Sequence, residues 1–184
     1  TVTVAYGHGL EVAPTQAVMA VSALVNGGHL FAPTFLPRTQ EQAMALSKTV
    51  IKPETSEAMR YIMRLNASNK IGTAGKADIE GYFVGGKTGT ADKSIHGHYD
   101  GKHVFTTFMA IAPADNPKYL FMTILDEPQA VQGTFGYQTA GWNAAPVTGA
   151  VIERVAPFLD LPKRFEPPVS PFPTMVKLGA WGTK

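Results

Sequence analysis

The sequence predicts an α+β fold built on an antiparallel sheet. Two runs rich in β-branched and aromatic residues, 104–112 and 119–125, have the composition of strands. The turn between them, at 113–117, is short, and strands joined by a short turn pair as an antiparallel hairpin. The chain has 184 residues, enough for one domain with a hydrophobic core. Apolar residues at helical spacing predict three helices, one starting at Pro14 and two spanning 56–66 and 144–159.

The first fifty residues contain one clear element, the helix that starts at Pro14. Proline fits the first turn of a helix, and the Asn-Gly-Gly sequence at 26–28 ends it. Because apolar residues occupy most of its sides, we expect this helix to be buried. The remaining segments give weaker signals: 1–6 predicts a short strand, 29–36 an edge strand or an extended loop, and 39–48 is ambiguous.

A third strand is predicted at 82–91, where an apolar run enters a glycine-rich segment that is followed by a polar loop at 92–101. The second half of the chain continues with the predicted hairpin. After it we expect a long loop at 127–143, a helix that Pro157 ends or bends, and an extended proline-rich tail from Leu161 onward.

The glycine-rich segment concentrates polar chemistry on one strand. Successive strand side chains point to opposite faces, so Lys87 and Gly89 share one face and Thr88 and Thr90 share the other. Gly89 leaves the backbone open to close approach. A cation, two hydroxyls and an open backbone edge suit an anionic, peptide-like ligand.

Composition excludes several classes of protein. Hydrophobic residues make up 45% and charged residues 16% of the chain, which indicates a globular protein. The net charge of +2 is small and no recognition motif is present, so we expect no nucleic-acid partner. No stretch reaches the roughly 20 apolar residues of a membrane span. The chain has no cysteine, which excludes a thiol nucleophile and a thiolate metal site.

The Lys87-Thr88-Gly89 sequence resembles the third signature of the penicillin-recognising serine acyltransferases, which include penicillin-binding proteins and serine β-lactamases. The flanks are similar to class B penicillin-binding proteins of the septal (division) type. This resemblance implies an antiparallel sheet with helices on both faces, of which the chain is the C-terminal portion, with 1–160 in the transpeptidase domain and 161–184 as the tail. The matching segments are 7–10, 14–16, 72–74, 77, 79–82, 86–91, 112–114 and 126–128.

The resemblance implies a role for each residue of the motif. Lys87 would lie beside the active-site serine and supply positive charge and hydrogen bonding. Thr88 and Thr90 would bind the terminal carboxylate of the substrate through their hydroxyls. Gly89 would leave room for the substrate backbone, and the Thr90 backbone N–H would form half of an oxyanion hole.

Two aromatic residues are further candidates for substrate contact. The family often has an aromatic pair before two glycines at the position of Thr134-Phe135-Gly136, so Phe135 is expected to touch the substrate. The alternative is a loop aromatic that packs on the core. Tyr137 stands where the second glycine would be, and its role stays open. Tyr99 lies in the loop that rims the active site in this family and is assigned to its wall.

Two other signatures of the family are missing. The chain contains neither the Ser-x-x-Lys nucleophile motif nor the Ser-x-Asn motif, both of which precede Lys-Thr-Gly in the family. Threonine versions at 49–52 and 174–177 are misplaced and are read as chance matches. We therefore expect this chain to carry the carboxylate and oxyanion side of a site whose nucleophile lies in an upstream part of a longer protein.

The resemblance implies a peptidoglycan D,D-transpeptidase. Its serine would attack the D-Ala-D-Ala carbonyl of a stem peptide, and β-lactams would acylate the same serine. No cofactor is implied. The implied partners are the N-terminal remainder of the protein and a septal glycosyltransferase with other division proteins. The implied location is the periplasmic face of the cytoplasmic membrane, with an anchor outside this chain.

Three alternative functions stay open. A β-lactamase or a D,D-carboxypeptidase would share Lys-Thr-Gly, although segments 72–81 and 126–128 favour the transpeptidase. A non-catalytic sensor domain that binds β-lactams or peptides would share the fold. In the third alternative, the chain is a folded structural piece with no activity of its own, because it lacks the nucleophile motif.

A metal site and a catalytic triad are disfavoured. His96, His98, Asp100 and His103 are neighbours in a glycine-containing loop, with no matching ligand pair elsewhere in the sequence. A Ser-His-Asp triad would need a serine elbow, and no Gly-x-Ser-x-Gly sequence exists. We therefore expect no metal.

Overall fold

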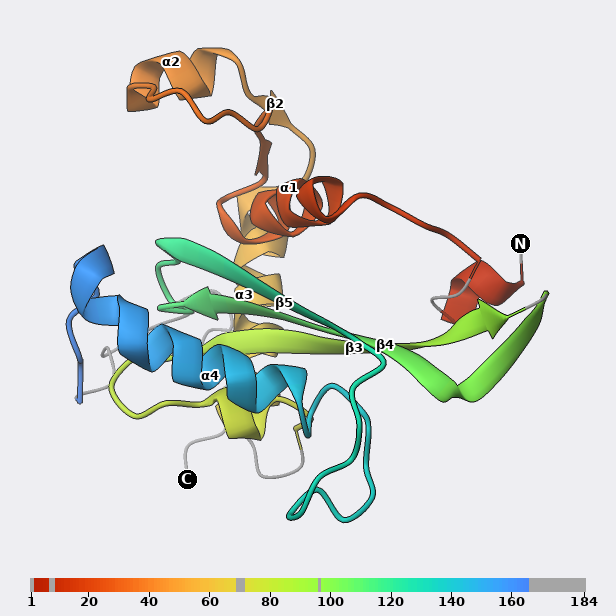
Figure 1. The fold of residues 1–184 in the computed structure, drawn as a ribbon. Helices are drawn as coiled ribbons and strands as arrows, with labels where there is room; N and C mark the ends of the chain where they lie inside the picture. Colours follow the sequence, from red (N-terminus) through yellow and green to blue (C-terminus); the bar gives the residue numbers. More distant parts are fainter. Residues whose placement is uncertain (1, 7–8, 69–71, 96, 166–184) are drawn as a thin grey trace.

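A computed structural model has at its centre a three-stranded antiparallel sheet of β3 (Gly85–Ile95), β4 (His98–Ala112) and β5 (Tyr119–Asp126), in that order (Figure 1). Helix α3 (Pro53–Ser68) lies against one face and helix α4 (Ala144–Val155) against the other. The predicted class, an antiparallel sheet with helices on both faces, is confirmed. The structure describes residues 2–6, 9–68, 72–95 and 97–165.

The helices agree with the sequence pattern, with shifted ends. Helix α1 starts at Pro14, as predicted, and α3 extends beyond the predicted 56–66 at both ends. Helix α4 ends before Pro157, which lies in a following 3₁₀ turn. The other elements are α1 (Pro14–Val25), β1 (His29–Leu30), α2 (Gln40–Ala45), β2 (Lys48–Thr49), η1 (Thr3–Tyr6), η2 (Gly75–Ala77) and η3 (Ala156–Leu159).

Two predictions for the first fifty residues need correction. Segment 1–6 is not a strand where it is described, because Thr3–Tyr6 is a 3₁₀ helix with no strand beside it in the described chain. Helix α1 is buried only at its C-terminal end, at Ala23 and Val25, because it packs on α3 there and its first turn faces solvent. The ambiguous segment 39–48 contains α2, which Thr39 caps by accepting the Gln42 N–H.

The predicted polar loop at 92–101 is instead the outer part of a hairpin. Strand β3 continues to Ile95 and β4 starts at His98, with a bulge between Asp92 and Lys93. This hairpin projects past α4 (Figure 1), and residues 97–99 near its tip are exposed. Because neither face is required to be apolar, the segment lacks the alternating pattern that marks a half-buried strand.

Two clusters of buried side chains hold the sheet to its helices. Phe108 and Ala110 of β4 and Ile152 of α4 have no exposed surface and lie in the first cluster. Ile111 of β4 packs with Met63 of α3 in the second. Alternate residues of β4 thus serve opposite faces, as strand geometry requires.

The expected tail starts with residues that belong to the folded body. Leu161 is only 7% exposed and lies in the first core cluster, so the prediction that nothing from Leu161 onward is core is wrong at this residue. Arg164 donates from its backbone to Gly81 O at 2.7 Å. Its guanidinium donates to both oxygens of Asp115, at 3.0 and 2.6 Å, and this pairing raises the pKa of Arg164. The prolines correctly predict an extended backbone, but side chains of an extended segment can still pack on the core.

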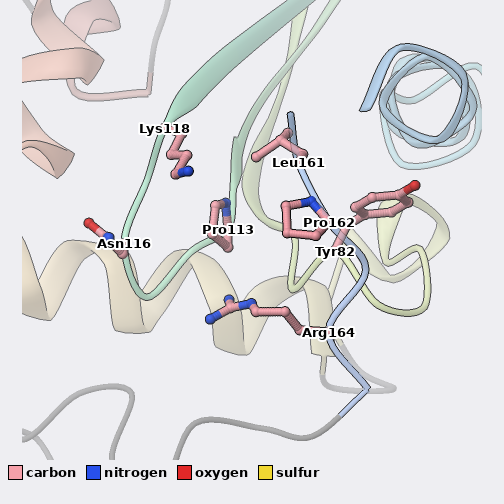
Figure 2. A pocket seen from close by; sticks show the side chains of 7 residues that line it. All are labelled: Tyr82, Pro113, Asn116, Lys118, Leu161, Pro162 and Arg164. Carbon is pink, nitrogen blue, oxygen red and sulfur yellow. The ribbon is translucent and has the colours of Figure 1, made fainter. Parts of the chain in front are cut away.

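These contacts surround a small pocket of about 140 Å³ at the end of the sheet (Figure 2). Arg164 and Tyr82 line it together with Pro113 of the turn before β5. Through Arg164, the segment after α4 therefore contacts both Gly81, which precedes β3, and Asp115 in the turn between β4 and β5. The rest of the expected tail, 166–184, lies outside the described residues.

We expect Arg164→Met to lower the free energy of unfolding by about 1–2 kcal/mol, because it leaves the mostly buried Asp115 carboxylate without its paired donors. Thermal unfolding of the full-length protein measures this loss. Arg154→Met, on the exposed side of α4, is the matched control and should unfold near the wild-type temperature.

A chain cut after Pro167 should also keep the wild-type unfolding temperature, and a clear drop would contradict that expectation.

Candidate active site

The Lys-Thr-Gly-Thr sequence lies on β3 at the edge of the sheet that the described residues form. Thr88 pairs across the strands with Phe108, and Thr90 pairs with Thr106, so both threonines point to the α4 side. Lys87 points to the other side, and the predicted division of the two faces is confirmed. An edge strand offers backbone N–H and C=O groups to which an extended peptide can add as a further strand.

A hydrogen-bond network connects the last turn of α3 to Thr88. Asn66 donates from Nδ2 to Gly86 O at 2.9 Å and accepts the Thr73 N–H at Oδ1, at 3.0 Å. The Thr73 hydroxyl lies 2.8 Å from the Thr88 hydroxyl and 3.2 Å from Asn66 Oδ1. The sequence predicts no role for Asn66 or Thr73. It marks only Thr73, which lies in one of the flanks that resemble the family.

The hydroxyls are arranged to donate to an anion. Thr90 Oγ1 accepts the N–H of Ala140 at 3.1 Å, so the hydroxyl proton of Thr90 is left for another acceptor. Thr73 can donate either to Asn66 or to Thr88, and when it donates to Thr88 the proton of Thr88 is also left. A carboxylate has only acceptor atoms and requires such donors.

Lys87 is exposed, and its ammonium donates to Thr88 O at 2.6 Å. The side chain makes no other hydrogen bond or ion pair among the residues that the structure describes. Because its face of β3 is opposite to that of the two threonines, Lys87 can reach a group that lies against the strand edge from the other side.

The aromatic candidates lie in two different places. Phe135 is 83% exposed and has a positive φ of 53°, and its ring lies edge-on to Trp142 at 5.6 Å between centroids. Its loop reaches the motif through the Ala140 contact to Thr90. Tyr99 pairs with Ser94 in the projecting hairpin, four residues beyond Thr90, which is roughly 13 Å along the strand. The structure thus brings the loop of Phe135 to the motif and holds Tyr99 apart from it.

An ion cluster fixes the start of the same loop. Lys93 donates to Asp126 at 2.7 Å and to Glu127 at 2.8 Å, and these hydrogen bonds, the one to Asp126 foremost, raise the pKa of Lys93. The Glu127 N–H donates to Val104 O at 2.9 Å. Lys93 lies 34 residues from Glu127 in the chain, so the local sequence gives no sign of this cluster.

The histidine-rich segment contains one histidine–carboxylate pair. His103 Nδ1 lies 2.9 Å from Asp100 Oδ2, and His98 lies at the start of β4. His96 is outside the described residues. Within the described ranges no three His, Cys, Asp or Glu side chains come together as metal ligands, and no helix has the length and apolar composition to cross a bilayer.

An antiparallel sheet between helices, with Lys-Thr-Gly on its edge strand, is the arrangement expected of the penicillin-recognising serine acyltransferases. The chain belongs to the family of penicillin-binding protein transpeptidase domains, whose model matches residues 1–153. Among curated proteins, the probable peptidoglycan D,D-transpeptidase FtsI of Caulobacter vibrioides is 37% identical over 169 residues, which are 88% of this chain and 28% of that protein. Stage V sporulation protein D of Bacillus subtilis is 37% identical over 171 residues, 88% of this chain and 25% of that protein. The chain therefore spans about a quarter of the length of these relatives.

Solved structures show the same similarity. The transpeptidase domain of penicillin-binding protein 3 from Burkholderia pseudomallei superposes with a TM-score of 0.75 at 30% identity, covering 89% of this chain and 47% of that one. Penicillin-binding protein 3 from Mycobacterium tuberculosis, in complex with ampicillin, gives a TM-score of 0.70 at 25% identity, covering 90% of this chain and 39% of that one.

Proposed function

We propose that the protein to which this chain belongs is a peptidoglycan D,D-transpeptidase that cross-links stem peptides during septal wall synthesis. A serine, expected outside this chain, attacks the carbonyl of the penultimate D-Ala of a stem peptide. The peptide bond breaks, the terminal D-Ala leaves with a proton, and an acyl-enzyme forms. The amine of a neighbouring stem peptide then takes the acyl group and releases the serine. Membership of the transpeptidase family and the name of the Caulobacter relative support this proposal.

The observation that carries the proposal is the donor arrangement on the edge of β3. The terminal carboxylate of the stem peptide accepts hydrogen bonds from Thr88 and Thr90, whose protons the contacts of Thr73 and Ala140 leave available. The substrate backbone lies along the strand edge at Gly89. Lys87 supplies positive charge beside the serine, and the Thr90 N–H polarises the reacting carbonyl. Phe135 contacts the acyl portion, and Tyr99 contributes to an outer wall.

We extend the proposal to β-lactams, location and partners. β-Lactams acylate the same serine, in agreement with the ampicillin and aztreonam complexes of the Mycobacterium tuberculosis relative. The enzyme works on the periplasmic face of the cytoplasmic membrane with a glycosyltransferase and other division proteins. Residues 1–160 belong to its transpeptidase domain, with 161–164 packed on that domain.

Two assays on the full-length protein test the proposed function. Labelling of the native protein with a fluorescent penicillin, followed by denaturing electrophoresis, detects the acyl-enzyme. Mass spectrometry of digested peptidoglycan detects the cross-linked stem peptides. We expect both signals. Rapid hydrolysis of the penicillin without cross-links would identify a β-lactamase, and label without cross-links would identify a sensor or a carboxypeptidase, so either result would overturn the proposal.

Thr73→Val is expected to lower the rate of penicillin acylation about tenfold, because Thr88 loses a hydroxyl donor and one charge-assisted hydrogen bond weakens. Valine keeps the shape and the backbone N–H to Asn66. Stopped-flow acylation of the full-length protein measures the rate. Thr73→Ser keeps the hydroxyl and should restore most of it. Equal rates for Thr73→Val and wild type would remove Thr73 from the site.

A further inference from the structure

The structure holds the ammonium of Lys76 over the ring of Trp142, with Nζ 4.1 Å from the ring centroid. Lys76 lies in η2, whose neighbour Ala77 has no exposed surface, and η2 packs on α4. The backbone that carries Lys76 is therefore fixed. Lys76 makes no ion pair within the described ranges, so the aromatic ring is the group that the structure gives to this cation.

Trp142 belongs to an ordered loop. Its ring stacks on Tyr137 at 5.4 Å with 13° between the planes, and Phe135 meets it edge-on. The Trp142 N–H donates to Thr139 O at 2.9 Å. Trp142 thus contacts Phe135 and Tyr137 through its ring and Thr139 through its backbone N–H.

The same loop contacts both threonine networks of the motif. The Ala140 N–H donates to Thr90 Oγ1 at 3.1 Å. Gly141 lies so close to the segment that carries Thr73 that a Cβ at this position would be 2.7 Å from Thr73 O. The Lys76 contact is therefore a second connection between the segment of Thr73 and the loop, beside the close approach of Gly141 to Thr73. The Ala140 N–H connects the same loop to Thr90, and the Thr73 hydroxyl lies against that of Thr88.

We propose that Lys76 is a positioning residue for carboxylate recognition. Its cation–π contact holds Trp142, and through the loop it holds the Ala140 N–H on Thr90 Oγ1, which keeps the Thr90 proton directed to the substrate carboxylate. The inference rests on the proposed function, since it requires a ligand with a carboxylate at this site. Because Lys76 is exposed, its cation–π contact is worth about 0.5–1 kcal/mol, enough to change ligand preference about two- to fivefold.

The test compares benzylpenicillin with its methyl ester on the full-length protein. The acid has the carboxylate that Thr88 and Thr90 would recognise, and the ester lacks its charge. The ratio of the two acylation rates therefore reports carboxylate recognition separately from the reactivity of the serine. Lys76→Met, which keeps chain length and loses charge, is expected to lower this ratio about two- to fivefold. Lys76→Arg keeps the cation and should restore the ratio.

Lys118→Met, an exposed lysine in the turn before β5, is the matched control and should keep the wild-type ratio. An unchanged ratio in Lys76→Met would overturn the inference and leave the proposed function intact. An equal loss of both rates, with a lower unfolding temperature, would make Lys76 merely structural and also overturn it. If wild type itself takes no label, the proposed function fails and the inference fails with it.

Discussion

Lys87→Ala in the full-length protein is expected to lower the rate of acylation by a fluorescent penicillin by about 10²–10⁴, the range for loss of a residue that takes part in proton transfer or stabilises charge at the reacting centre. The ammonium is the cation that the motif places beside the edge of β3. Its side chain is exposed and makes its hydrogen bond only to the carbonyl of Thr88 within the described chain, so its loss should not unfold the domain. The time course of labelling gives the rate, and thermal unfolding checks the fold.

The matched control for Lys87→Ala is Lys48→Ala, an exposed lysine on β2 that lies on a separate two-stranded sheet. The control should label at the wild-type rate. Normal labelling of Lys87→Ala, in a protein whose wild type labels, would contradict the assignment of β3 as the catalytic edge. Slow labelling together with a lower unfolding temperature would indicate a structural role instead.

The parts of the fold that the sequence predicts are those that pack into the core. Segment 104–112 has buried residues in both core clusters and 119–125 is partly buried, so their β-branched and aromatic residues show the composition of strands. The outer part of the β3–β4 hairpin is exposed near its tip, so its sequence lacks this composition and predicts a loop. Helix α1 has the composition of a buried helix, but burial depends on which neighbours it meets, and local sequence does not contain that information.

The residues of the candidate site also fall into two groups, those that the sequence predicts and those that only the folded chain reveals. Lys87, Thr88 and Thr90 are adjacent in sequence, so one motif and the alternation of a strand place them correctly relative to each other. Asn66, Thr73 and Ala140 reach the motif from three other segments, up to 50 residues away, and only the folded chain brings them together.

A second large effect is expected in the core beneath the motif. Phe108 has no exposed surface, and its ring fills the space that a side chain at Gly86 would occupy: a Cβ built on Gly86 would lie 2.3 Å from Phe108 Cζ and 2.8 Å from Met109 O. Phe108→Ala should lower the free energy of unfolding by about 3–5 kcal/mol, because it leaves a cavity between the sheet and α4. Gly86→Ala should cost about 1–3 kcal/mol by overpacking.

The double variant Gly86→Ala with Phe108→Ala tests the contact between these two positions. Phe108→Ala removes the clash of the new methyl group with the ring and leaves its close contact with Met109 O, so the double variant should be more stable than the sum of the two losses by about 1 kcal/mol. Denaturant unfolding of the four proteins gives this interaction free energy. Simple additivity would mean that Phe108 does not determine glycine at position 86. Since Gly86 immediately precedes Lys87, Gly86→Ala should also displace the motif and slow acylation, and Phe108→Ala in the same chain should recover part of that rate.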